Sequence, residues 1–310
     1  MIRYLFKNSE TQSFGELKDY RKGAWVDVAS PSEDEVKALC AKFKLDEGHI
    51  ADALDPDEVP RIEKEGDLTY VFVRYPYAAP GGEFETSPLL FIVGPKQFIT
   101  VAAGQARFLE RFMRGGEQIN VAQPDKTLLV IMEEVIDQYE QLINRISRQI
   151  NTIRSRLKGQ TISNKDFVNF VVVEDALNEF LSAMIPLAGV LRRTLRYSSS
   201  DVFASVSDDD VEDLILNNDQ SIENCRSNIK SVVNIREAYS TINSNNLNQT
   251  MKMLTAVTVL ITFPNVVFSM YGMNIGLPLS GEPWAFALLL AISLGLPLSL
   301  LVWARRRKLL

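Results

Sequence analysis

The sequence predicts an α/β N-terminal domain, a long α-helical stalk and two C-terminal transmembrane helices. Strand-like and helix-like runs alternate up to about residue 125, whereas only helical periodicity follows as far as residue 250. Two apolar runs come next, at 251–270 and 284–304, and the second carries no charge. A transmembrane helix needs roughly 20 mostly apolar residues, so both runs are long enough to cross a bilayer.

Residues 1–125 are predicted to form the α/β domain. Ser32 and Glu35 make a capping box that opens one helix, and further helices are expected at 47–54 and 106–114. Runs rich in β-branched and aromatic residues lie between Gly and Pro breakers and predict strands at 2–6, 25–29, 68–75, 88–93 and 97–102. Because helices and strands are interleaved, we expect a sheet with helices packed against it.

Residues 126–206 are predicted to form an antiparallel helical hairpin. Apolar residues recur at three-to-four spacing over 128–157, which predicts a first long helix. Gly159 and the polar residues after it end this helix. A second helix is expected at 166–196, with a kink at Pro186 because proline cannot donate the helical hydrogen bond. Two long helices joined by a short break pack side by side.

The third helix is predicted to continue into the first transmembrane span. The acidic residues 208–210 suit its positive N-terminal end, and no breaker follows over 211–263. Apolar side chains recur in two heptad-spaced series, which predicts packing against neighbours along the helix: Ile215, Ile222, Ile229 and Cys225, Val232, Tyr239. We expect a stalk at 207–250 and a spanning helix at 251–273. A continuous helix over 211–270 has about sixty residues and is therefore about 90 Å long. Pro264 is tolerated inside a spanning helix.

Charge indicates the orientation of the two spans. Lys252 lies at the start of the first span and the basic tail 305–310 follows the second, whereas the connecting loop 274–283 has no Lys or Arg. The positive-inside rule therefore predicts that both long ends are cytosolic and that the loop is extracytoplasmic. With the second span at 284–304, the protein is predicted to be multi-pass.

Composition and motifs argue against several function classes. The net charge of −6 argues against a nucleic-acid partner. The single histidine, His49, cannot form an HExxH zinc site, and Cys40 and Cys225 lack metal-ligand spacing. Neither a GxxxxGKS/T nor a GxGxxG motif is present, so ATP-driven transport is not supported. We expect no enzyme activity and no organic cofactor.

The segment Tyr271-Gly272-Met273-Asn274 closes the first span. Glycine and asparagine both suit a turn, which is the simplest explanation of the tetrapeptide. Its place between two C-terminal spans, with a basic run after the second, resembles the CorA family of magnesium transporters, and the likeness is closest over 248–274. The resemblance implies that Gly272, Met273 and Asn274 form the selectivity filter of a magnesium channel in a bacterial-type inner (plasma) membrane.

The resemblance also implies an oligomer. Two helices cannot enclose an aqueous path, so a pore needs several subunits, and the family forms a funnel-shaped homopentamer. The family's first span lines the pore, and helical spacing puts the matching positions on one face: Asn248, Met251, Leu254, Thr258, Thr262 and Asn274. In a ring, Met251 and Leu254 would form an apolar collar that gates by dewetting. Thr262 departs from the bulky apolar residue that the family often carries there.

The chemistry of magnesium fits these residues. Mg²⁺ loses its water shell reluctantly, so a ring of neutral Asn274 amides would accept hydrogen bonds from the bound water without trapping the ion. The membrane potential supplies about 2.3 kcal/mol per charge for each 100 mV, or roughly 4.6 kcal/mol for a divalent cation moving inward. We therefore expect Mg²⁺ as the transported ion, and membrane lipid and divalent cations as partners.

The resemblance also implies regulation by cytosolic Mg²⁺, through acidic residues outside the spans. Asp52 matches a regulatory carboxylate of the family, whose partner comes from the long helix of the neighbouring subunit and matches Asp213. Glu237 matches a further acidic position. The resemblance thus implies that Mg²⁺ bridges neighbouring subunits and closes the channel. The residues alone leave open the alternative that these carboxylates form a solvated acidic surface.

Two other functions stay open. A zinc, cobalt or nickel transporter would share this architecture, although no His or Cys lies in the expected pore to favour a softer ion. A membrane-anchored sensor that does not conduct would need a pore row blocked by bulk or charge. The row here carries hydroxyl and amide side chains apart from Met251 and Leu254, which argues against the sensor.

Overall fold

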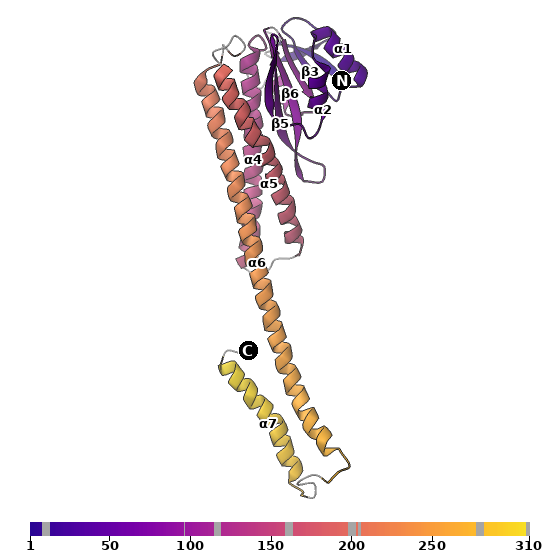
Figure 1. The fold of residues 1–310 in the computed structure, drawn as a ribbon, viewed down its shortest axis with the longest axis vertical. Helices are drawn as coiled ribbons and strands as arrows, with labels where there is room; N and C mark the ends of the chain where they lie inside the picture. Colours follow the sequence, from indigo (N-terminus) through magenta and orange to yellow (C-terminus); the bar gives the residue numbers. More distant parts are fainter. Residues whose placement is uncertain are drawn as a thin grey trace. The chain divides into compact units, whose positions relative to one another are not determined.

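The computed structural model describes residues 1–7, 13–95, 97–114, 119–158, 164–197, 203, 206–276 and 282–307. The chain divides into two compact units, Met1–Asn234 and Ile235–Leu310. The first unit carries a β-sheet with the helices packed on it, and the second carries the two apolar spans (Figure 1). Three predicted features lie wholly or partly outside the described residues: the helix break at 159–163, the loop at 277–281 and the tail at 308–310.

The described part of the first unit contains one mixed seven-stranded sheet, in the order β2-β1-β3-β7-β6-β5-β4. β3 and β7 pair in parallel, and all other neighbours pair antiparallel. The five predicted strands are confirmed. The two edge strands were not predicted, because β2 is only four residues long and β4 is mostly polar. The strands are β1 (Ile2–Lys7), β2 (Phe14–Leu17), β3 (Trp25–Ala29), β4 (Arg61–Glu65), β5 (Leu68–Ala78), β6 (Phe84–Gly94) and β7 (Gln97–Ala102).

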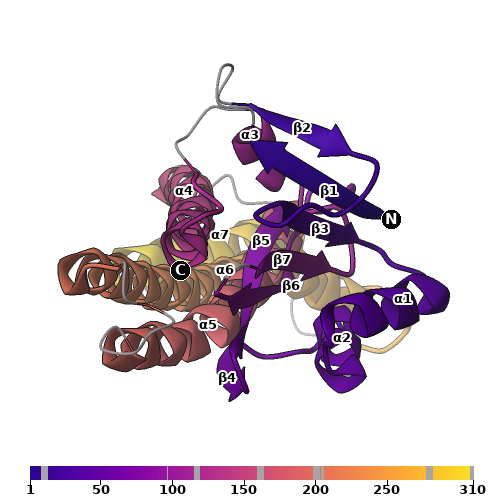
Figure 2. The same ribbon diagram turned by 90° about the horizontal axis from the view of Figure 1, so that it is seen from above.

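The sheet lies between two groups of helices (Figure 2). One face is covered by α1 (Glu33–Phe43) and α2 (Glu47–Leu54), and α1 begins at the predicted capping box. Ile50 of α2 is buried in the same apolar cluster as Tyr70 and Phe72 of β5. Alternate residues of a strand lie on opposite faces of the sheet. The face of β5 that carries Tyr70 and Phe72 is therefore the face that packs against α2.

The other face is covered by α4 (Pro124–Lys158) and α5 (Asn164–Tyr197), which lie side by side. The ring of Tyr139 in α4 is fully buried, and its hydroxyl donates a hydrogen bond to the carbonyl oxygen of Arg74 in β5 at 3.0 Å. This bond satisfies a polar atom that burial would otherwise make costly. The helix α5 continues through Pro186.

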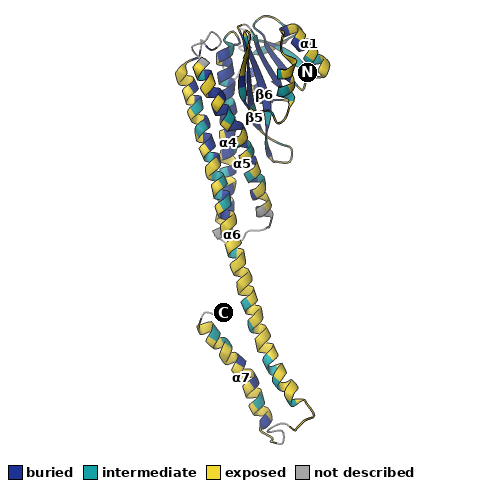
Figure 3. Ribbon diagram, viewed as in Figure 1, coloured by how far each residue is buried: buried dark blue, intermediate teal, exposed yellow. Residues whose placement is uncertain are grey.

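The longest helix, α6 (Asp208–Tyr271), runs unbroken for 64 residues, as the sequence predicts. Up to Ile235 one side of α6 is buried, and beyond it most residues are exposed (Figure 3). One helix thus carries both a packed segment and the first predicted span. The second span lies in α7 (Ala285–Arg306), and the helix predicted at 106–114 is the shorter α3 (Leu109–Met113).

Candidate functional site

Two helices in the described part of the chain are long and apolar enough to cross a membrane. The most apolar window of α6 has a mean hydropathy of 1.8 and is 0% buried, and that of α7 has a mean hydropathy of 2.4 and is 17% buried. Large apolar side chains such as Leu254, Ile261 and Phe286 are exposed along both helices. Apolar surface of this extent needs lipid or other protein chains to cover it.

The predicted pore row lies on the exposed part of α6. Its helical members are separated by three or four residues and so share one helix face: Asn248, Met251, Leu254, Thr258 and Thr262. All five are exposed. The hydroxyl of Thr258 donates to the carbonyl oxygen of Leu254 at 2.8 Å, so its oxygen lone pairs stay available to accept hydrogen bonds from water.

The Gly-Met-Asn segment directly follows the end of α6. Gly272 N–H donates to the Phe268 carbonyl oxygen at 2.9 Å, and Met273 N–H donates to the Met270 carbonyl oxygen at 3.3 Å. These two hydrogen bonds hold the first residues after α6 against its last turn. A Cβ atom on Gly272 would lie 3.4 Å from the Phe268 carbonyl oxygen, an ordinary contact distance, so a side chain would fit here without a clash.

Asn274 does not lie on the helical face of the pore row. The sequence analysis placed it there, but α6 ends at Tyr271 and Asn274 lies in a bend beyond it. The helical period no longer applies after the last turn, so the local loop geometry sets the direction of this side chain. Its side chain is exposed, as is that of Met273.

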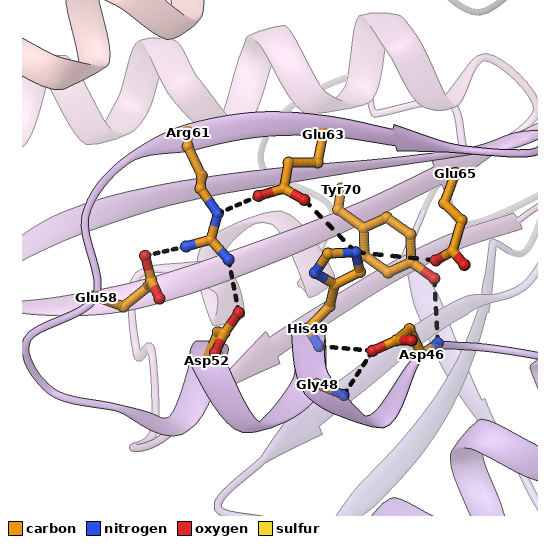
Figure 4. A network of polar contacts seen from close by, with 9 residues as sticks. All are labelled: Asp46, Gly48, His49, Asp52, Glu58, Arg61, Glu63, Glu65 and Tyr70. Carbon is orange, nitrogen blue, oxygen red and sulfur yellow. Dashed lines mark hydrogen bonds and ion pairs between the residues drawn. The ribbon is translucent and has the colours of Figure 1, made fainter.

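In the first unit, Asp52 forms an ion pair that the sequence analysis did not predict (Figure 4). Arg61 Nη2, at the start of β4, donates to Asp52 Oδ2 at 2.7 Å. The same guanidinium donates from Nε to Glu63 Oε1 at 2.6 Å and from Nη1 to Glu58, and lies 3.9 Å from the ring centroid of Phe72. Burial lowers the pKa of Arg61, but these carboxylate contacts outweigh it and the pKa is raised. Arg61 thus holds three carboxylates together.

The single histidine lies beside this network. His49 Nε2 is 3.8 Å from Glu63 Oε2 and 3.9 Å from Glu65 Oε2, and its ring centroid is 4.2 Å from that of Tyr70. Glu63 therefore faces both Arg61 and His49 (Figure 4). The sequence spacing could have predicted part of this arrangement, because residues 61, 63 and 65 are two apart and therefore lie on one face of a strand.

The other two predicted regulatory carboxylates lie on α6. Asp213 and Glu237 are exposed on α6, and within the described chain neither is bonded to Asp52. Among the described residues, no group of three or more His, Cys, Asp or Glu is arranged to hold a metal ion.

Comparison with known sequences identifies the family. A family model described as CorA-like Mg²⁺ transporter protein matches residues 21–306. The cobalt/magnesium transport protein CorA of Methanocaldococcus jannaschii is 21% identical over 294 residues, with 89% of this chain and 87% of the relative covered. The putative metal ion transporter YfjQ of Bacillus subtilis is 23% identical over 287 residues, with 90% of this chain and 87% of the relative covered.

Solved structures show the same fold. The complete CorA magnesium transporter of M. jannaschii superposes with a TM-score of 0.81 at 18% identity, over 99% of this chain and 98% of that one. Full-length CmaX gives a TM-score of 0.75 at 17% identity, over 99% of this chain and 96% of that one. The α/β unit, the long helix and the two C-terminal apolar helices are therefore those of a known architecture. Because the family model matches nearly the whole chain, the chain belongs to the CorA-like Mg²⁺ transporter family.

Proposed function

We propose that this protein carries Mg²⁺ across a bacterial-type inner membrane as a homo-oligomeric channel driven by the membrane potential. The observation that carries the proposal is the position of Gly272-Met273-Asn274 at the end of α6, whose exposed face presents the hydroxyl and amide row. Family membership supports Mg²⁺ as the ion. In this proposal, the first unit and the basic C-terminal end are cytosolic.

The channel requires several copies of the chain. Two spanning helices cannot surround a water-filled path, and the apolar surface of α6 and α7 is uncovered in a single chain. We propose a homopentamer, the number that the family resemblance implies. The rows of small and hydroxyl residues on α6 would then face one another around the pore, and Met251 and Leu254 would form its apolar collar.

Asn274 would select the hydrated ion at the outer mouth of this pore. Mg²⁺ retains its waters, so a neutral amide ring that accepts hydrogen bonds from those waters fits the ion better than direct coordination. The inward driving force is about 4.6 kcal/mol at 100 mV for a divalent cation, and no nucleotide is needed.

Cytosolic Mg²⁺ would close the channel by joining neighbouring subunits. Asp52 of one subunit and Asp213 of the next would share the ion through retained waters, and Glu237 would supply a further carboxylate lower on the stalk. Weak binding of this kind suits an abundant ion. Bound Mg²⁺ would favour the closed state by a population shift, so a difference of a few kcal/mol is enough.

Cobalt is the second candidate ion. The M. jannaschii relative is described as a cobalt/magnesium transport protein, and a filter that contacts the water shell would accept divalent ions of similar hydrated size. The uptake of zinc and nickel would be measured in the same ion-uptake experiment. No His or Cys occurs over 248–276, so a softer ion would find no nitrogen or sulfur ligand there.

The decisive experiment is ion uptake into proteoliposomes. Full-length protein, an Asn274→Ala variant and a matched Gln249→Ala control, which removes an exposed amide from the opposite face of α6, would be reconstituted with an inside-negative potential. We expect dye-reported Mg²⁺ uptake in the wild type and the control, and uptake at the protein-free background in Asn274→Ala. Normal flux through a correctly inserted Asn274→Ala oligomer would reject the filter assignment, and uptake of Co²⁺ without Mg²⁺ would reverse the choice of ion.

A further inference from the structure

A groove of about 440 Å³ lies between α6 and α7, entirely within the unit Ile235–Leu310. Lys252, Ala256 and Val259 line it from α6, and Pro297, Leu300 and Ala304 line it from α7. The stretch of α6 from Lys252 to Leu260 spans about 12 Å along the helix axis. That length is close to the hydrocarbon thickness of one bilayer leaflet, which is about 15 Å.

Lys252 is the only ionisable residue among those that line this groove. Its side chain is half-buried, and within the described residues its ammonium group makes no hydrogen bond or ion pair. The nearby hydroxyl of Thr255 is already bonded to the Met251 carbonyl oxygen at 2.8 Å. A cation that is partly removed from water without an anion is costly, so the groove favours an anionic occupant.

The groove is also polarised along its length. Its charged end holds Lys252 and Asn248, and Ala304, which lines it from α7, directly precedes the exposed Arg305 and Arg306. The remaining lining is almost wholly apolar. A free phosphate would gain nothing from that apolar floor, whereas a molecule with an anionic head and a hydrocarbon tail would contact both parts.

We propose that this groove binds an anionic phospholipid of the cytoplasmic leaflet. The phosphodiester accepts a hydrogen bond from Lys252, the exposed arginines at the end of α7 add attraction, and one acyl chain lies against Ala256, Val259, Pro297 and Leu300. The inference rests on the membrane orientation of the proposed function and not on which ion is carried. Because Met251 also lines the groove, the lipid would contact the helix at the level of the proposed apolar collar.

Native mass spectrometry of the full-length protein in detergent tests the proposal. Phosphatidylglycerol and phosphatidylcholine of identical chains would be titrated against the wild type, Lys252→Gln, Lys252→Arg, and Lys230→Gln as an exposed basic control in the first unit. We expect the wild type to prefer phosphatidylglycerol and Lys252→Gln to bind it about fivefold more weakly, the effect of one lysine beside an anionic lipid. Lys252→Arg and Lys230→Gln should retain the preference. An Ala256→Phe variant, which fills the apolar floor, should weaken binding while keeping the charge.

Four outcomes would overturn the proposal. Equal binding of the two lipids by the wild type, or equal phosphatidylglycerol binding by the wild type and Lys252→Gln, would remove the role of the charge. Displacement of the lipid by inorganic phosphate would indicate a free-anion site. Loss of the oligomer in Lys252→Gln with unchanged lipid binding would assign Lys252 to a subunit contact. A protein that prefers phosphatidylglycerol but transports no Mg²⁺ would instead reject the proposed function and leave this inference standing.

Discussion

At the scale of single residues, the carboxylate proposed to sense Mg²⁺ already has a cation beside it. Asp52, Glu58 and Glu63 share the guanidinium of Arg61, so three negative charges meet one positive charge and the network keeps a formal charge of −2. Asp52 and Arg61 are both partly exposed, and such ion pairs contribute little to stability. In the proposed sensor, a divalent cation would therefore compete with Arg61 for Asp52 at modest cost.

Removing this competitor should make the proposed sensor more responsive. In Arg61→Gln, we expect magnesium-dependent protection of the first unit from protease to reach its midpoint at lower Mg²⁺, by roughly fivefold for an ion pair worth about 1 kcal/mol. Proteolysis of full-length protein across a Mg²⁺ titration measures the midpoint. Arg111→Gln, which breaks the Arg111–Glu134 pair elsewhere in this unit, is the control. A midpoint that stays in place or rises would show that Arg61 does not compete with Mg²⁺.

The two proposed ligands should act as one site. We expect Asp52→Ala or Asp213→Ala to weaken the same magnesium-dependent protection and to leave channels less inhibited by internal Mg²⁺, because either change breaks the bridge between subunits. The double variant should add little to either single change, since the two residues are coupled. Asp209→Ala, in the acidic first turn of α6, should behave like the wild type. Wild-type protection in both single variants would identify these carboxylates as a solvated surface.

At the scale of elements, α6 changes its surroundings along its length. Its N-terminal part is packed in the first unit, where Asn218 Nδ2 donates to the Met184 carbonyl oxygen of α5 at 3.0 Å. Its C-terminal part is exposed and apolar. The proposed gating requires a displacement in the first unit to reach the span, and α6 is the element that contains residues of both units.

Cys225 reports whether α6 stays packed in the first unit. Its side chain is 0% exposed, and burial raises the pKa of its thiol to about 12. Since the thiolate is the reactive form, iodoacetamide at pH 8 should leave Cys225 unmodified in the native protein and alkylate it after unfolding in guanidinium chloride. Mass spectrometry of a Cys40→Ser background would isolate this one thiol. Rapid native alkylation would mean that α6 separates from the unit under ordinary conditions.

At the scale of the whole molecule, the exposed spans predict assembly. Both apolar windows are largely uncovered in one chain, and lipid alone would not provide a water-filled path. Light scattering of the full-length protein in detergent should give the mass of a pentamer after subtraction of the detergent. The fragment 1–234, which forms a compact unit of its own, serves as a control for association without spans. A full-length monomer would exclude the proposed pore.

Local patterns in the sequence were enough to predict much of this protein. Buried strands such as β5 and β7 could be predicted because their sequences are rich in β-branched and aromatic residues. The two spans could be predicted because they are long apolar segments. The unbroken α6 followed from the absence of breakers over 211–263. The motif at 271–274 could be placed because it stands next to a span. Each of these signals depends only on neighbours along the chain.

The tertiary structure alone decided the features that depend on distant segments. The edge strand β4 has little apolar pattern of its own and is held by pairing with β5, as Ile62 with Val71. The parallel pairing of β3 with β7 joins segments about 70 residues apart. Arg61 meets Asp52 only because α2 packs beside β4 on the sheet. Periodicity in the sequence indicates which face of an element is apolar, whereas packing determines which faces meet. The contact between Arg61 and Asp52 depends on packing, and for that reason it could not be predicted from the sequence.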